Sequence, residues 1–112
     1  MRRAAGFAAI VFCLPAHAEP APRWTFCVAA AQGGAEVWIS EVFLAQRSRE
    51  RLEGDFKSAV ERLGGAGASA LCPNPRLDKT VAENAQFDVE AFNRETGVNV
   101  HTTPANAFPG RR

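Results

Sequence analysis

The sequence has no excess of charge of either sign: its 112 residues include 13 basic and 12 acidic side chains. Proteins that bind nucleic acids or anionic membranes usually carry a basic excess or a basic stripe. Arg47, Arg49 and Arg51 are interleaved with Glu50 and Glu53, a pattern typical of a solvated helix face. We therefore expect no nucleic-acid partner.

Side chains suited to catalysis are also scarce. There are two histidines and no tyrosine, and only His101 lies beyond residue 18. A hydroxyl or thiol nucleophile usually needs a neighbouring base, and no Gly-x-Ser-x-Gly elbow is present. The glycine-rich run at 64–67 follows a predicted helix and leads into a strand, whereas a phosphate-binding loop runs from strand to helix. We expect no enzyme activity, no metal and no cofactor.

No apolar run reaches the roughly 18 residues that a membrane-spanning helix needs. A shorter run at 4–14 follows Arg2 and Arg3 and leads to Ala16-His17-Ala18, which is the layout of a secretory signal peptide. We predict a signal peptide at 1–18, cleaved between Ala18 and Glu19. A linker at 19–22, a domain at 23–102 and a loose tail at 103–112 would follow. The product would be periplasmic or secreted, with no stable membrane insertion.

Cysteine is rare, and cleavage would remove Cys13 and leave only Cys27 and Cys72. Exported proteins form disulfides in their oxidising compartments, so we predict a Cys27–Cys72 bond. The chain-entropy model gives about 4 kcal/mol of stabilisation for a loop of this length. A redox-active pair is the alternative, although redox centres favour the closer Cys-x-x-Cys spacing.

Two strand-like segments, 24–30 and 36–44, flank a Gln-Gly-Gly turn signal. If Gly33 and Gly34 form the tip, Val28 pairs with Ile39 and Ala29 pairs with Trp38. Continued without interruption, this register collects large apolar side chains on one face, namely those of Trp24, Phe26, Val28, Val37, Ile39 and Phe43. Glu41 is a misfit on that face, on which we expect the helices to pack.

Helical spacing of apolar residues predicts helices at about 46–63 and 77–95. The first stripe consists of Leu52, Phe56, Ala59, Val60 and Leu63. The second stripe consists of Leu77, Val81, Ala85, Val89 and Phe92, with Ala82 beside it. Short strands are predicted at 66–72 and 98–102, which gives the order β-β-α-β-α-β.

This order predicts an α/β (α+β) fold with one four-stranded mixed sheet. If both helices share one face, right-handed crossovers must step in one direction across the sheet. The strand order is then 2-1-3-4, with strand 1 antiparallel to its neighbours and Cys27 close to Cys72.

The opposite face would carry no helix and would present Trp38, Thr25, Ser40 and His101. Aromatic side chains concentrate binding energy, so Trp38 is the candidate anchor for a partner or a glycan. The alternative is that Trp38 covers the disulfide or is itself covered by the tail.

Segments 24–30, 37–43, 70–73, 92–93 and 97–100 resemble those of small exported proteobacterial proteins. Such proteins have an aromatic-Cys hairpin start and a second Cys before a helix. The resemblance covers roughly residues 24–100 and implies export and a small fold, without implying a mechanism. A four-stranded sheet with two helices is also similar to glycan-binding SPOR domains, although those have a helix after their first strand.

The expected function is therefore that of an exported, non-enzymatic domain that binds a protein or an envelope component through its open sheet face. A thiol-disulfide participant and an envelope glycan-binding module are the alternatives.

Overall fold

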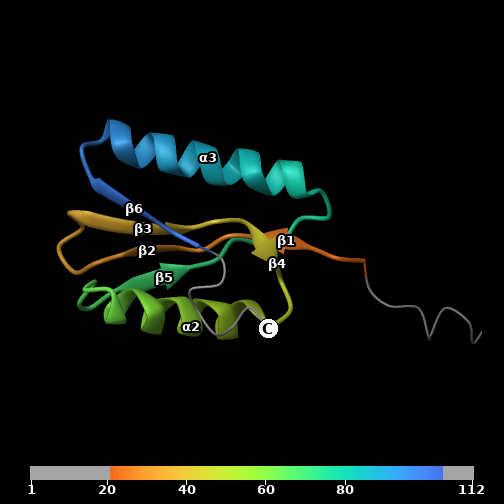
Figure 1. Cartoon of the computed structure of the whole chain (residues 1–112), viewed down its shortest axis with the longest axis horizontal. Coiled ribbons are helices and arrows are strands. Elements are labelled where there is room, and N and C mark those ends of the chain that lie inside the picture. The colour runs from red at the N-terminus through yellow and green to blue at the C-terminus, as the bar shows by residue number, and fades with distance from the viewer. Residues whose placement is uncertain (1–20, 105–112) are drawn as a thin grey trace, which may run out of the picture.

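The computed structural model describes residues 21–104 of the chain, and the predicted signal peptide with its cleavage site lies outside them. The elements in chain order are β1 (Trp24–Thr25), β2 (Val28–Ala30), β3 (Glu36–Ser40), β4 (Phe43–Leu44), α2 (Arg49–Arg62), β5 (Ser69–Leu71), α3 (Lys79–Glu95) and β6 (Asn99–Thr103). Four strands form a mixed sheet in the order β5-β2-β3-β6, and β1 and β4 form a separate two-stranded ribbon. The sheet lies between the two helices, with α3 on one side and α2 on the other (Figure 1). The protein is a small α+β domain.

The hairpin has the register that its glycine turn predicts. Val28 is paired with Ile39 and Ala29 with Trp38. At the tip, Gly33 and Gly34 have φ values of 94° and 75°. Residues with a side chain rarely adopt these values, so the two glycines allow the chain to reverse here.

The predicted hairpin does not continue as one ladder, and the prediction of a single sheet is wrong. The Ser40 N–H still donates to the Cys27 carbonyl (2.9 Å), in the hairpin register. Two residues before Cys27, however, Thr25 is paired with Phe43 rather than with Val42. The second strand therefore contains one extra residue, which is a β-bulge.

The bulge decides which face the later side chains occupy. A shift of one residue turns every following side chain to the opposite face of a sheet. Phe43 therefore packs in the core cluster of Cys27, whereas Val42 packs beside Phe26. Glu41, which an uninterrupted strand would place on the apolar face, is exposed at the bulge.

The predicted strand order is right for three strands and wrong for the last. Predicted strands 1, 2, 3 and 4 correspond to β2, β3, β5 and β6. As predicted, the first of them is antiparallel to its neighbours and lies beside the third, since β2 pairs with both β3 and β5. However, β6 pairs in parallel with β3 and not with β5. In the numbering of the four predicted strands, the order is 3-1-2-4 rather than 2-1-3-4.

The position of β6 also explains why the two helices do not share a face. The connection through α2 crosses β2 in one direction, and the connection through α3 returns across the sheet to its far edge. A right-handed crossover that reverses direction must carry its helix on the opposite face. Figure 1 shows α2 and α3 on opposite sides, which corrects the prediction that both pack on one face.

Each helix covers only part of its face. α2 packs against β5 and β2, whereas α3 packs against β6, β1 and β3. The α2 side holds the larger core cluster, which contains the two cysteines and the four buried helix residues Leu52, Phe56, Ala59 and Val60. On the other side, Ala85 and Val89 of α3 cover a smaller cluster of Phe26, Val37 and Ile39.

The contact side of α3 agrees with the predicted stripe only in part, since Ala85 and Val89 pack on the sheet. Ala82 is its only buried residue, whereas Val81 and Phe92 are 40% and 64% exposed and Leu77, just before the helix, is 60% exposed. Small alanine side chains let a helix approach a sheet closely, and the larger apolar side chains of the predicted stripe are left at the surface.

Candidate functional site

The side chains that were expected to line an open sheet face are mostly buried. Trp38, Thr25 and Ser40 are 6%, 2% and 0% exposed, so the prediction of an open face at these residues is wrong. Trp38 and Thr25 lie on the side that α2 covers, since Trp38 belongs to the cluster beneath that helix. Of the four predicted residues, only His101 is exposed.

The two buried hydroxyl groups have structural partners. Ser40 Oγ accepts a hydrogen bond from the Cys27 N–H (2.9 Å) and donates to the Glu41 carbonyl (3.0 Å). Thr25 Oγ1 donates to the Pro73 carbonyl (2.9 Å). These bonds satisfy backbone groups around the bulge and after β5, so both residues stabilise the fold.

Trp38 is enclosed by the end of α2 and by the last strand. The turn after the helix approaches so closely that a Cβ at Gly65 would lie 3.0 Å from the Trp38 ring and 2.5 Å from Val60 Cγ1. His101 also stacks on the indole, with ring centroids 4.7 Å apart. The same histidine is hydrogen-bonded to Glu36 (Nε2 to Oε1, 2.7 Å), which ties β6 to β3 at the surface.

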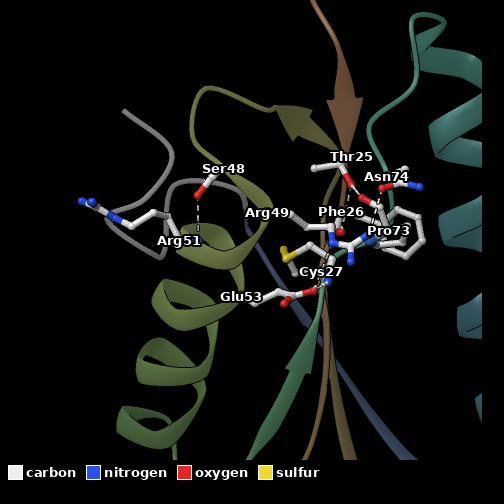
Figure 2. A network of polar contacts seen from close by, with 10 residues as sticks. Thr25, Phe26, Cys27, Ser48, Arg49, Arg51, Glu53, Pro73 and Asn74 are labelled. Carbon is white, nitrogen blue, oxygen red and sulfur yellow. Dashed lines mark hydrogen bonds and ion pairs between the residues drawn. A yellow bond between two sulfur atoms is a disulfide. The ribbon is translucent and has the colours of Figure 1, made fainter.

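The predicted disulfide is confirmed: Cys27 and Cys72 are bonded, and both are 0% exposed. Side chains of α2 hold the chain next to it (Figure 2). Glu53 Oε2 accepts a hydrogen bond from the Cys72 N–H (2.9 Å), and Arg49 Nη1 donates to Asn74 Oδ1 (2.8 Å). The bond is therefore part of the packed core and has no exposed sulfur that an attacking thiolate could reach.

The described part of the chain has neither a metal-binding cluster nor a membrane span. Within residues 21–104, no three or more side chains of His, Cys, Asp or Glu come together as a metal site requires. No helix among these residues is both long enough and apolar enough to cross a membrane.

The most distinctive surface is apolar and lies where α3 leaves the sheet uncovered. Leu71 on β5 is paired with Val28, so its side chain is on the same sheet face as α3. It is nevertheless 59% exposed, because α3 packs over the other strands of that face. A strip along β2 and β5 is thus left without a helix.

One flank of α3 borders this strip. Val81, Ala85, Asp88 and Phe92 recur at spacings of four, three and four residues and therefore share one side of the helix. A small cavity shows which part of the molecule this side of the helix faces. Ala85 lines the cavity together with β1 and with the segment after β5, including Pro73 and Arg76.

The opposite flank of α3 faces a different part of the molecule. Lys79, Glu83 and Gln86 line a cavity of about 340 Å³ together with Glu41 and Val42 at the bulge. The flank with Val81 and Phe92 is therefore the one that faces β5. We call the uncovered strip and this flank the α3–β5 face, which contains Val28, Ala30, Leu71, Val81, Ala85, Asp88 and Phe92.

The helix border of the α3–β5 face is acidic at one end. Glu95 continues the spacing of Asp88 and Phe92, so two carboxylates flank the exposed phenyl ring. Neither carboxylate forms an ion pair with another residue of the described range. The face thus combines exposed apolar side chains with two carboxylates at the Phe92 end of its border.

No protein-family model matches this chain, and neither the curated proteins nor the solved structures include a significant match.

Proposed function

We propose that this protein is an exported, non-enzymatic binding domain that docks a protein of the cell envelope through the α3–β5 face. The observation that carries this proposal is the exposure of Leu71, Val81 and Phe92, at 59%, 40% and 64%. Large apolar side chains that share one face of a small domain are typical of an interaction surface. Burial of Phe92 alone in a partner would contribute roughly 1.5–3 kcal/mol.

The charges around this face indicate the chemistry of the partner. Asp88 and Glu95 would be brought close to any surface that covers Phe92. Burying carboxylates without partners is costly, whereas opposite charges across an interface favour association. The expected partner therefore presents an apolar patch bordered by lysine or arginine side chains.

The disulfide supports the export part of the proposal. Such bonds persist in oxidising compartments, and the Cys27–Cys72 bond lies in the core. Export itself has a direct test in the intact mass of protein made in an export-competent host. The proposal predicts a chain that begins at Glu19 and has no free thiol before reduction.

The two alternatives have less support. A thiol-disulfide role needs a sulfur that a second thiolate can reach, and both sulfurs are buried. A glycan site at Trp38 needs an accessible ring face, and His101 stacks on this indole.

The chain offers a closely matched pair of variants for the binding test. Phe92 and Phe87 lie on the same helix and are 64% and 66% exposed, but only Phe92 is on the α3–β5 face. Disulfide-bonded wild-type protein, Phe92→Ser and Phe87→Ser would each be immobilised and exposed to envelope extract, and bound proteins would be quantified by mass spectrometry.

We expect one basic partner to be retained equally by wild type and Phe87→Ser and at least tenfold less by Phe92→Ser, as for loss of a binding anchor. Thermal melts of all three proteins provide the control for folding. Equal retention of the partner by the two variants would contradict the placement of the site.

A further inference from the structure

A second surface feature lies away from the α3–β5 face, where the β1–β4 ribbon meets the segment that leads into α2. It is a cavity of about 390 Å³ with two cationic side chains, Arg23 and Arg47, in its wall. Apolar side chains of Pro22, Leu44 and Pro75 form much of the remainder. No acidic side chain is among the described residues that line it.

Backbone hydrogen bonds hold the walls of this cavity together. The Ala45 N–H donates to the Arg23 carbonyl (2.9 Å). Trp24, the next residue, exchanges two hydrogen bonds with Arg76, of 2.7 and 2.8 Å, which also fixes the neighbouring Pro75. Three segments that are distant in the sequence are therefore joined before any ligand arrives, and a preformed site loses less entropy on binding.

The size and chemistry of the cavity indicate one class of ligand. Its volume is in the range of small-molecule sites, roughly 300–1,000 Å³. A guanidinium presents five N–H donors in a planar fork that suits carboxylate and phosphate groups, so it can serve more than one acceptor. The apolar walls suit a short hydrocarbon body, and Gln46 is the one uncharged polar side chain among the described residues of the lining.

We propose that this cavity binds a small amphiphilic anion, in which a single carboxylate or phosphate contacts Arg23 and Arg47 and a short apolar chain lies against Pro22, Leu44 and Pro75. This site is independent of the proposed docking of a protein on the α3–β5 face, since the two share no residue.

Three probes with eight carbon atoms each separate the contributions to binding. Octanoate and octyl phosphate carry the two anionic groups, and 1-octanol carries none. Binding of each to the full, disulfide-bonded protein would be measured by calorimetry and by chemical-shift changes at residues 22–23 and 44–47. The test variants are Arg23→Gln and Arg47→Gln, and the control is Arg51→Gln, an exposed arginine on α2 that does not line the cavity.

At least one anionic probe should bind the wild type and the Arg51→Gln control equally. It should bind about tenfold or more weakly to each test variant, as expected when hydrogen bonds to a charged group are lost. Octanol should also bind at least about tenfold more weakly than that anion. If Arg47→Gln loses its fold in a thermal melt, Arg23→Gln alone decides the result.

Three outcomes would overturn the proposal: octanol binding as tightly as the anions, unchanged affinity in Arg23→Gln, or no detectable binding of either anion at about 1 millimolar. Preference for octanoate or for octyl phosphate would identify the anionic group. Retained anion binding in Phe92→Ser would show that this site and the α3–β5 face succeed or fail separately.

Discussion

Replacement of both bonded cysteines by alanine should remove a large share of the stability of the domain. The bond joins residues separated by 45 positions, and the chain-entropy model gives about 4 kcal/mol at 25 °C for a loop of that size. Small domains are stable by roughly 5–15 kcal/mol, so Cys27→Ala/Cys72→Ala should leave a marginal protein. Both positions are fully buried, and the loss of packing around two sulfur atoms adds to the effect.

Urea unfolding at constant pH is the appropriate assay, with wild type and the double variant compared by circular dichroism. The free energy of unfolding falls by about 1–2 kcal/mol per molar urea in a small protein. A loss of about 4 kcal/mol should therefore lower the urea midpoint by about 2–4 M. Strong reductant should shift the wild type toward the variant and leave the variant itself unchanged. A variant within about 1 kcal/mol of the oxidised wild type would refute the reasoning, because the loop would then contribute little to the unfolded-state entropy.

Three further substitutions test the packing of α2 and of the hairpin. Gly65→Ala should lower the free energy of unfolding by about 1–3 kcal/mol in a thermal or urea melt, because the added Cβ would collide with the Val60 side chain and crowd Trp38. An unchanged melt would mean that the turn after α2 is further from the indole. Gly54→Ala has open space around its Cβ on the exposed side of α2, so the same melt should show stabilisation of about 0.5–1 kcal/mol. Ser40→Ala leaves the buried Cys27 N–H without its acceptor and should cost about 1–3 kcal/mol, with faster hydrogen exchange at that amide; unchanged exchange would exclude the bond.

The hairpin could be predicted because its turn is a local signal, and the disulfide could be predicted because few cysteines are available to pair. Gly33 and Gly34 define the tip, and alternation of apolar residues then aligns Ala29 with Trp38. Of the three cysteines, the predicted cleavage would remove Cys13 and leave one possible pairing, and the antiparallel neighbours β2 and β5 bring Cys27 and Cys72 together.

The bulge could not be derived from residue pattern alone, although the sequence contains one sign of it. An inserted residue does not change the composition of a strand, and the apolar residues on either side keep their alternation. Glu41 was the only charged residue on the predicted apolar face, and this position is next to the insertion. A lone charge on an otherwise apolar strand face is therefore a signal for a shift in register.

The open face was misplaced because the direction of the second crossover is not encoded locally. Nothing in the α3 segment indicates whether the chain continues past β5 or returns to pair with β3. The return places the helices on opposite faces, which buries Trp38 and leaves Leu71 exposed.

The predicted stripe on α3 is right for Ala85 and Val89 and wrong for Val81 and Phe92 for a related reason, because the helix has two apolar sides. Ala82, Ala85 and Val89 are spaced as regularly as Val81, Ala85 and Phe92, and helical period alone does not rank them. The sheet selects the smaller set, which permits closer packing. α3 has more apolar residues than one buried stripe needs. This excess is the sequence signal for an interaction surface on the helix.

The central claim, that the α3–β5 face docks an envelope protein, is tested most directly by site-specific photo-crosslinking in the export-competent host. A photoreactive phenylalanine derivative would replace Phe92 in one strain and Phe87 in another, two positions of equal exposure on opposite sides of α3. The account predicts one discrete crosslinked species, with the same basic partner, from position 92 and none from position 87. Equal crosslinking from both positions, or none from position 92 in correctly exported protein, would contradict it.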